Sequence, residues 1–231
     1  MVRSKVASAF FLIAIFLLSV QSPTLLVSSK DNETSGRAQT TWSGSVVLNN
    51  HHTIPVTDEL VISACTNVTM SNGVRIYVEG RITVEGTSTC PVYFDYAGGG
   101  DHMGIQFNSS SNGRGSKIDN ASIVHSTYGI TIYGSDPYLA NVTVWNPDDV
   151  GVDLFNSATP TIRNLVIDEA GQDWNFPAYW RYGIGLSIGA GSAPNVDGLY
   201  VNDAVTRGLN IWGNSGGLIR NISLTNITGA T

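Results

Sequence analysis

The sequence predicts an all-β solenoid, and three observations lead to this fold class. A unit of two short apolar segments and two turns occurs twice in succession, with 22 residues from Gly129 to Gly151 and 23 from Asn141 to Asn164. So short a unit, with no helix, cannot bury its own apolar residues and has to stack on copies of itself. In addition, only 13% of the residues are charged, and short runs of Val, Ile, Leu and Thr recur without helical periodicity.

Residues 1–29 have the layout of a secretory signal peptide or of an N-terminal anchor. Arg3 and Lys5 precede an apolar run over residues 6–20, and small residues precede a cleavage site after Ser29. An uncleaved anchor is the alternative, because apolar character resumes at residues 25–27. Either alternative takes the bulk of the chain out of the cytoplasm, so we predict a secreted or cell-surface protein.

The remaining chain divides into a lead-in and the solenoid. Residues 30–41 are polar and are expected to form a flexible lead-in, whereas residues 42–231 carry the stacked units. We expect Trp42 to Ile62 to cover the first layer, whose strand edges would otherwise be unpaired. No matching cover is visible at the C-terminal end. We therefore expect further coils or self-association at that edge.

Two cysteines, Cys65 and Cys90, are the whole complement of the chain and lie 25 residues apart. This separation is close to one repeat and would place them on adjacent layers. Layers of a stack lie about 4.8 Å apart, which is within the Cα separation that a disulfide tolerates. A structural disulfide is the favoured interpretation outside the cell, and two buried thiols are the alternative.

Five repeats align residue by residue in both halves. Side chains alternate across a strand, so Ile130 and Ile132 are expected to point into the stack and their neighbours outward. In the second half, Val144 and its partners point inward, whereas Ala140 and Thr143 are expected to face solvent. The first halves begin at Gly104, Gly129, Gly151, Gly185 and Gly208, and the second halves begin at Ile118, Leu139, Ile162, Val196 and Ile219.

One column of the alignment is a corner. Its members are Asn120, Asn141, Asn164 and Asn221, with Gly198 in the remaining place. Asn and Gly are the residues that tolerate positive φ, and stacked Asn amides can hydrogen-bond to the layers above and below. We interpret these asparagines as structural.

These units resemble the right-handed parallel β-helix repeat proteins, whose fold is shared with the pectin-lyase-like family. The resemblance rests on the Gly-φ-x-φ and φ-x-Asn-φ-x-φ units, in which φ is an apolar residue, and on the segment from Val78 to Phe94. It covers the chain from about Leu60 onward. It implies a right-handed parallel β-helix, but this fold carries lyases, hydrolases, adhesins and spacers alike.

The outward positions of the glycine-initiated strands form the best candidate binding surface. Sugars are bound by hydrogen bonds to their hydroxyl groups and by aromatic faces, and this strip offers both. The alternative is that the aromatic residues only stack on one another and protect the sheet. One column reads Gln106, Thr131, Asp153, Ser187 and Asn210, and the next reads Asn108, Tyr133, Phe155, Gly189 and Trp212.

A longer loop interrupts the period after Asn164. The interval from Asn164 to Gly198 is 34 residues, about eleven more than the 23-residue period, and the insertion includes Trp174 and Trp180. Long loops on rigid scaffolds often carry function. We therefore add Trp174 and Trp180 to the candidate binding residues, with a self-packed loop or a protein contact as alternatives.

Catalysis is the second hypothesis. Polygalacturonase-like hydrolases of this fold carry paired aspartates, a further Asp and a Gly-His-Gly segment, and residues 147–149 and 183–188 show a distant similarity to the aspartate pair and to the Gly-His-Gly segment; Ile184 occupies the histidine position. Asp148, Asp149 and Asp153 are the candidate catalytic carboxyl groups. Inverting hydrolysis requires two carboxyl groups on either side of the bond. Lyase chemistry requires an Arg or Lys base, and the repeats hold few candidates. The sequence leaves open whether the protein is an enzyme.

The net charge and the spacing of possible metal ligands limit the classes of partner and cofactor. The net charge of −6 and the lack of a basic stripe argue against nucleic acid. The four histidines show no shared ligand spacing, so we assign no metal and no cofactor. We predict a secreted or cell-surface β-helix that binds a polysaccharide along its outward sheet face. A polysaccharide-degrading enzyme and an adhesin or envelope spacer are the alternatives.

Overall fold

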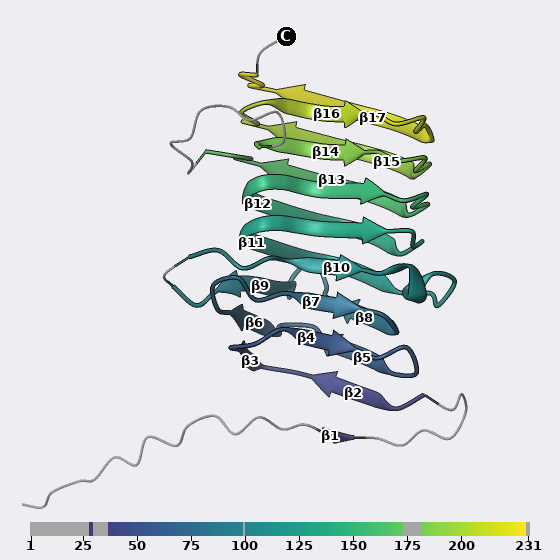
Figure 1. The fold of residues 1–231 in the computed structure, drawn as a ribbon. Coiled ribbons are helices and arrows are strands. Elements are labelled where there is room, and N and C mark those ends of the chain that lie inside the picture. The colour runs from purple at the N-terminus through teal and green to yellow at the C-terminus, as the bar shows by residue number, and fades with distance from the viewer. Residues whose placement is uncertain (1–27, 30–36, 99, 173–181, 230–231) are drawn as a thin grey trace, which may run out of the picture.

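A computed structural model describes residues 28–29, 37–98, 100–172 and 182–229. Its strands stack along one axis as successive coils, from β2 at one end to β17 at the other (Figure 1). Each coil passes through three stacks of parallel strands, here called stacks A, B and C. The strands β11 (Lys117–Tyr133) and β12 (Tyr138–Phe155) run through all three stacks without a break. The fold is thus a parallel β-solenoid of about eight coils, as predicted.

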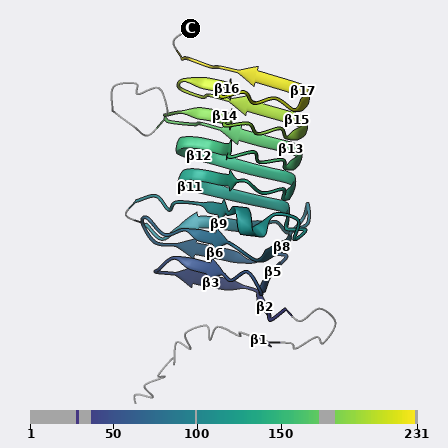
Figure 2. The same ribbon diagram turned by 45° about the vertical axis from the view of Figure 1, so that its right-hand side comes forward.

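The strands fall into the three stacks by their pairing, and the turned view shows the same layering (Figure 2). Stack A holds β2 (Gln39–Trp42), β5 (Glu59–Ser63), β8 (Arg81–Glu85) and the first parts of β11, β12, β13 (Thr161–Asp168), β15 (Asn195–Asn202) and β17 (Leu218–Thr225). Stack B holds β3 (Ser45–Leu48), β6 (Asn67–Met70), β9 (Val92–Tyr96) and the later parts of the same long strands. Stack C holds β4 (His52–Ile54), β7 (Ile76–Val78), β10 (Ile105–Phe107), the ends of β11 and β12, β14 (Ile184–Ile188) and β16 (Arg207–Ile211).

Two short elements lie outside this pattern. The strand β1 (Ser28–Ser29) pairs antiparallel with β2, and the 3-10 helix η1 (Ser109–Ser111) follows β10. Within the described part of the chain, no helix is long and apolar enough to span a membrane. Most of residues 1–29 lie outside the described residues, so the signal peptide or anchor stays a prediction.

The core consists of aliphatic columns that run through the stack. The inward positions are buried as the alternation predicts, and Ile130 and Ile132 have no exposed surface. The column of stack A is formed by Trp42, Ile62, Val84, Ile118, Leu139, Ile162, Val196 and Ile219. Each residue lies between its equivalents in the coils above and below, so the core continues without any helix.

The glycine that begins each repeat is required by a close approach. A Cβ atom at Gly129 would lie 2.5 Å from Cγ1 of Val144, and one at Gly151 would lie 2.6 Å from Cγ2 of Ile167. In both cases the neighbour is an inward residue of stack B in the next coil. The glycine therefore faces the interior at the start of stack C, and any side chain there would displace the core.

The predicted asparagine corner is confirmed in its backbone conformation. Asn120, Asn141, Asn164 and Asn221 have φ values of 49°, 51°, 51° and 54°. The Asn164 amide donates to Oδ1 of Asn141 over 3.0 Å, and the Asn141 amide donates to the Asp119 carboxylate over 3.2 Å. The column thus connects neighbouring coils by side-chain hydrogen bonds.

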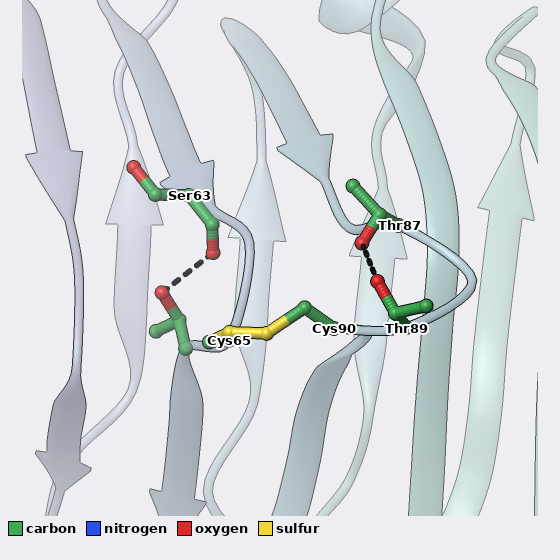
Figure 3. Close-up of a disulfide and its surroundings, with 6 residues drawn as sticks. Ser63, Cys65, Thr87, Thr89 and Cys90 are labelled. Atoms are coloured by element: carbon green, nitrogen blue, oxygen red, sulfur yellow. Dashed lines mark hydrogen bonds between the residues drawn. A yellow bond between two sulfur atoms is a disulfide. The ribbon is translucent and has the colours of Figure 1, made fainter.

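The predicted disulfide is also present. Cys65 and Cys90 are bonded with a Cα separation of 4.8 Å, and they join the corner after β5 to the segment before β9 (Figure 3). This separation matches the distance between adjacent coils on which the prediction depended.

Three details differ from the expectations. The first coil begins at Gln39, inside the range expected to be a flexible lead-in. Residues 42–62 form regular parallel pairs with later strands and not a separate cover. Backbone pairing determines both differences, because a strand at the end of a stack needs no apolar side chains to hydrogen-bond to its neighbour. Ala140 is buried, although it points away from the core, because it lies between the larger Asp119 and Arg163 on adjacent coils.

The last strands of the stacks, β16 and β17, expose positions that are buried elsewhere. Val201 in β15 has no exposed surface, whereas its partner Leu224 in β17 is 43% exposed. Ile211 in β16 is likewise 49% exposed, although its partner Ile188 is fully buried. Self-association through this edge is not tested by the structure and stays a prediction.

Candidate functional site: a groove on the outer side of stack C

The outward column of stack C is aligned as the repeats predict. Gln106 pairs with Thr131, Thr131 with Asp153, and Asp153 with Ser187, which in turn pairs with Asn210. Five polar side chains from β10, β11, β12, β14 and β16 therefore follow one line, about 4.8 Å apart. The neighbouring column brings Tyr133 beside Phe155, with their rings at 4.9 Å in an edge-to-face arrangement.

This line is less open than its outward direction suggests. Thr131 and Asp153 are each only 6% exposed, and Ser187 is 4% exposed. Because adjacent coils lie so close together, larger side chains on both sides of the polar column restrict the access of solvent to it. The polar column is therefore the floor of a groove and not an open surface.

Two adjoining cavities form this groove, and Asp153 lines both. The first has a volume of about 320 Å³ and is lined by Arg75, Met103, Gln106, Tyr128, Thr131, Asp153 and Phe155. The second has a volume of about 310 Å³ and is lined by Val150, Asp153, Ile184, Ser187, Arg207, Asn210 and Trp212. Coils are numbered from the N-terminal end, each beginning with its stack A strand, so that β2 begins coil 1, β5 coil 2 and β17 coil 8. The two cavities together extend from Arg75 in coil 2 to Trp212 in coil 7, with Asp153 of coil 5 near the middle.

Arg75 organises the N-terminal part of the groove. Its guanidinium lies 5.9 Å from the ring centre of Tyr77 and 5.5 Å from that of Tyr128, and its Nε donates to the carbonyl of Met103. It also donates to Oε1 of Gln106, whose amide nitrogen donates onward to Asn108 over 2.8 Å. Burial lowers the pKa of Arg75 from its ordinary value. These contacts fix the orientation of the Gln106 amide, so that its N–H groups point away from Arg75.

Trp212 forms the C-terminal wall, and Gly189 makes its position possible. A Cβ atom at Gly189 would lie 2.1 Å from Cε2 of the indole, so the ring lies flat over this glycine. The indole Nε1 donates to the hydroxyl of Ser187 over 3.4 Å, and the side chain is 47% exposed. An exposed ring that is held at one edge by a hydrogen bond offers its other face to a ligand.

The candidate aspartates occupy two different places. Asp153 is in the groove, whereas Asp148 and Asp149 are buried in β12 at the corner before stack C and line neither cavity. All three have interactions within the protein. Among the described residues that line the groove, Asp153 is thus the sole carboxylate. Trp174 and Trp180 lie outside the described residues, and the described part of the chain contains no cluster of metal-ligating side chains.

Some lining residues lay outside the predicted set. Tyr128, Val150, Ile184 and Arg207 pair with one another in the register that immediately precedes the repeat glycine. The strict alternation fails here, because the glycine occupies an inward position and the residue before it then points outward. The residue before Gly can be located in every repeat of the sequence. Predicting that its side chain points outward, however, requires knowing that the chain bends at the glycine.

A family model described as the right-handed beta helix region matches residues 44–228, which is most of the chain. Neither the comparison with curated proteins nor that with solved structures found a match.

Proposed function

The chain belongs to the family of right-handed β-helix proteins, and from this premise we propose that it binds a polysaccharide along the outer side of stack C, outside the cell. The observation that supports this proposal most is the groove formed by two cavities in line, which share Asp153. Its floor carries hydroxyl, amide and carboxylate groups, and Tyr128, Phe155 and Trp212 contribute aromatic surface to its walls. This combination suits a sugar, whose hydroxyl groups form hydrogen bonds while its C–H faces pack on rings.

The length of the groove favours a chain over a single sugar. Arg75 precedes the stack C strand of coil 2 and Trp212 follows that of coil 7, so five steps of about 4.8 Å separate them, or roughly 24 Å. All lining positions lie on consecutive coils in one direction. An extended, repeating ligand would meet an equivalent position at each step.

Binding is better supported than hydrolysis. Hydrolysis of a glycosidic bond requires a second carboxyl group across the bond from the first. Asp153 is the sole carboxylate among the described residues of the groove, and Asp148 and Asp149 line neither cavity. The enzyme hypothesis predicts reducing ends or unsaturated products that disappear in Asp153→Asn. Products formed at the same rate by this variant would remove Asp153 from any catalytic role.

The disulfide supports the extracellular part of the proposal. Cys65 and Cys90 are bonded across two coils, and such bonds persist in oxidising compartments. Residues 1–29 have the composition of a signal peptide or anchor. N-terminal sequencing of protein from the culture medium and from the membrane fraction would distinguish secretion from anchoring.

The binding test uses affinity electrophoresis and calorimetry with a panel of neutral, acidic and amino-sugar polysaccharides. Trp212→Ala is expected to weaken binding about tenfold, the effect of losing one aromatic contact. Gly189→Ala should act similarly, because the new methyl group displaces the indole and with it the Nε1 hydrogen bond to Ser187. Tyr200→Ala removes an equally exposed ring from stack B and is the matched control.

Two results would contradict the proposal. Failure of every polysaccharide to bind the native protein would exclude glycan binding by this groove. Equal losses in Trp212→Ala and Tyr200→Ala would place the binding surface elsewhere.

A further inference from the structure

The C-terminal cavity combines an aliphatic wall with polar groups. Val150 and Ile184 pair on consecutive coils and both line the cavity, although they are only 4% and 3% exposed. The polar lining comprises the Asp153 carboxylate, the Ser187 hydroxyl, the Asn210 amide and the Arg207 guanidinium. A methyl substituent on a sugar would match two β-branched aliphatic residues better than a hydroxyl group would, because a hydroxyl group placed against them has no hydrogen-bond partner there.

The N-terminal cavity differs at the equivalent register. There the residue that precedes the glycine is Tyr128, which pairs with Val150 and packs against Arg75. An aromatic residue in one coil is thus replaced by aliphatic residues in the next two. The C-terminal cavity is therefore adapted to a small apolar group beside hydrogen-bonding atoms.

An acetamido group has this set of features. Its N–H donates, its carbonyl oxygen accepts, and its methyl group is apolar. The Asp153 carboxylate can accept from the N–H, Asn210 and Arg207 can donate to the carbonyl, and Val150 and Ile184 can contact the methyl group. Asp153 and Arg207 also interact within the protein. A carboxylate offers about four lone-pair sites and a guanidinium five N–H groups, so neither role requires an otherwise unoccupied side chain.

We propose that this cavity recognises the acetamido group of an N-acetylated amino sugar, so that the ligand is a polysaccharide that contains N-acetylhexosamine. The inference rests on the proposed polysaccharide binding and specifies its substrate class. Discrimination arises because a sugar that lacks the acetamido group would lose the hydrogen bond from Asn210 and would leave the aliphatic wall of Val150 and Ile184 without an apolar contact.

The experiment compares three β-1,4-linked pentasaccharides of equal length, built from N-acetylglucosamine, glucosamine and glucose, with hyaluronan as a second N-acetylated polymer. Calorimetry should show that the native protein binds an N-acetylated ligand at least about tenfold more tightly than the glucose and glucosamine oligomers. Glucosamine is the control for simple charge attraction, because its ammonium group would be drawn to Asp153 without filling the aliphatic wall.

Two variants assign the effect to the cavity. Ile184→Thr keeps the β-branched shape but makes the wall polar, and we expect it to reduce the ratio of the affinities for the acetylated and the glucose oligomers about fivefold to tenfold. Asn210→Asp replaces a donor by an acceptor and should also weaken binding of the acetylated ligand. Val47→Thr, at an exposed position of stack B, is the matched control.

The outcomes separate this inference from the proposed function. Binding of the glucose or glucosamine oligomer as tightly as of the N-acetylated ligands would overturn the inference and leave polysaccharide binding intact. A preference that persists in both Ile184→Thr and Asn210→Asp would also overturn it. Failure of all polysaccharides to bind would overturn both proposals together.

Discussion

The corner between stacks A and B is built in two ways along the same solenoid. In coils 2 and 3 the chain makes this corner with residues 64–66 and 86–91, and a disulfide joins the two corners (Figure 3). In coils 4, 5, 6 and 8 a single asparagine with positive φ makes it. A covalent bond thus holds the wider N-terminal corners, whereas hydrogen-bonded amides hold the narrow C-terminal ones.

The asparagine ladder is divided into two short runs. One run passes from Asn164 through Asn141 to the Asp119 carboxylate, and the other from Asn221 to Asp197 over 2.6 Å. Gly198 lies between them, and its missing side chain breaks the ladder. Each run ends on a carboxylate, which accepts the amide N–H groups more strongly than a neutral oxygen would. Several hydrogen bonds, each weakly stabilising, thus hold the corners of the C-terminal half, whereas one disulfide holds those of the N-terminal half.

Removing the disulfide should have the largest effect. The bond closes a loop with a sequence separation of 25 residues, and its loss is expected to cost about 3 kcal/mol, mainly by freeing the unfolded chain. The double variant Cys65→Ser with Cys90→Ser should unfold at a lower urea concentration, and hydrogen exchange should rise first in β5, β6, β8 and β9. Reductant should have no effect on this variant. An unchanged midpoint would show that the wide corners are stable without the bond.

Acidification should have the next largest effect, through His102 in the N-terminal half. Burial lowers the pKa of His102 to about 4 from 6.5. Nδ1 accepts from the N–H of Gly104 over 3.0 Å, so Nε2 carries the proton and donates to the carbonyl of Val124 in coil 4 over 3.1 Å. The unfolded state binds a proton below pH 6.5 and the folded state does not, so stability falls as pH drops from 6.5 to 4. The loss should reach about 3 kcal/mol.

His102→Gln is the variant that isolates this contribution. A glutamine amide can both accept from Gly104 and donate to Val124, yet it does not titrate in this range. Urea unfolding between pH 7 and pH 4 should therefore show a smaller decrease in stability for the variant than for the native protein. Equal decreases in the two proteins would assign the acid sensitivity to other groups.

A single step of the ladder should have the smallest effect. Asn141→Ala places alanine at φ 51°, a conformation that is unfavourable for a side chain unable to hydrogen-bond locally, and it removes two hydrogen bonds of the ladder. Together these effects should lower the free energy of unfolding by about 2 kcal/mol. Asn141→Gly restores the conformational freedom and should recover about half of this loss.

The matched control for the ladder is Asn112, an exposed asparagine with φ −60°. Asn112→Ala should leave the free energy of unfolding within about 0.5 kcal/mol of the native value. A similar loss at both positions would mean that the positive φ and the ladder contribute nothing specific at Asn141.

The repeats made most of the fold predictable. Once the units are aligned, the inward columns, the asparagine corner and the placement of Cys65 beside Cys90 follow from a period of 2 within strands and about 23 between coils. The first coil was harder to predict, because Gln39 to Thr41 pair through their backbone and show no apolar pattern. Ala140 was also misassigned, since its burial depends on the size of its neighbours on adjacent coils.

The site was predictable only in part. The sequence identified the column that contains Thr131, Asp153 and Asn210, because outward positions follow from alternation. It did not predict that Thr131 and Asp153 would be nearly inaccessible or that Arg75 would close one end. Nor did it identify Val150 and Ile184, because the repeat glycine shifts the alternation by one residue at the bend. Such features depend on contacts between coils, which no pattern within one coil contains.

The in-register stack also sets the length of ligand that the proposed groove would accommodate. Five consecutive coils each contribute one position to the floor of the groove, so the number of coils would set the length of a ligand bound there. Duplicating coil 5 would lengthen the groove by about 4.8 Å while presenting the same core face to both neighbours. In the proposed site, the length of ligand that fits and the chemical selectivity are therefore separable. The length depends on the number of coils, and the selectivity depends on a few outward residues in each coil.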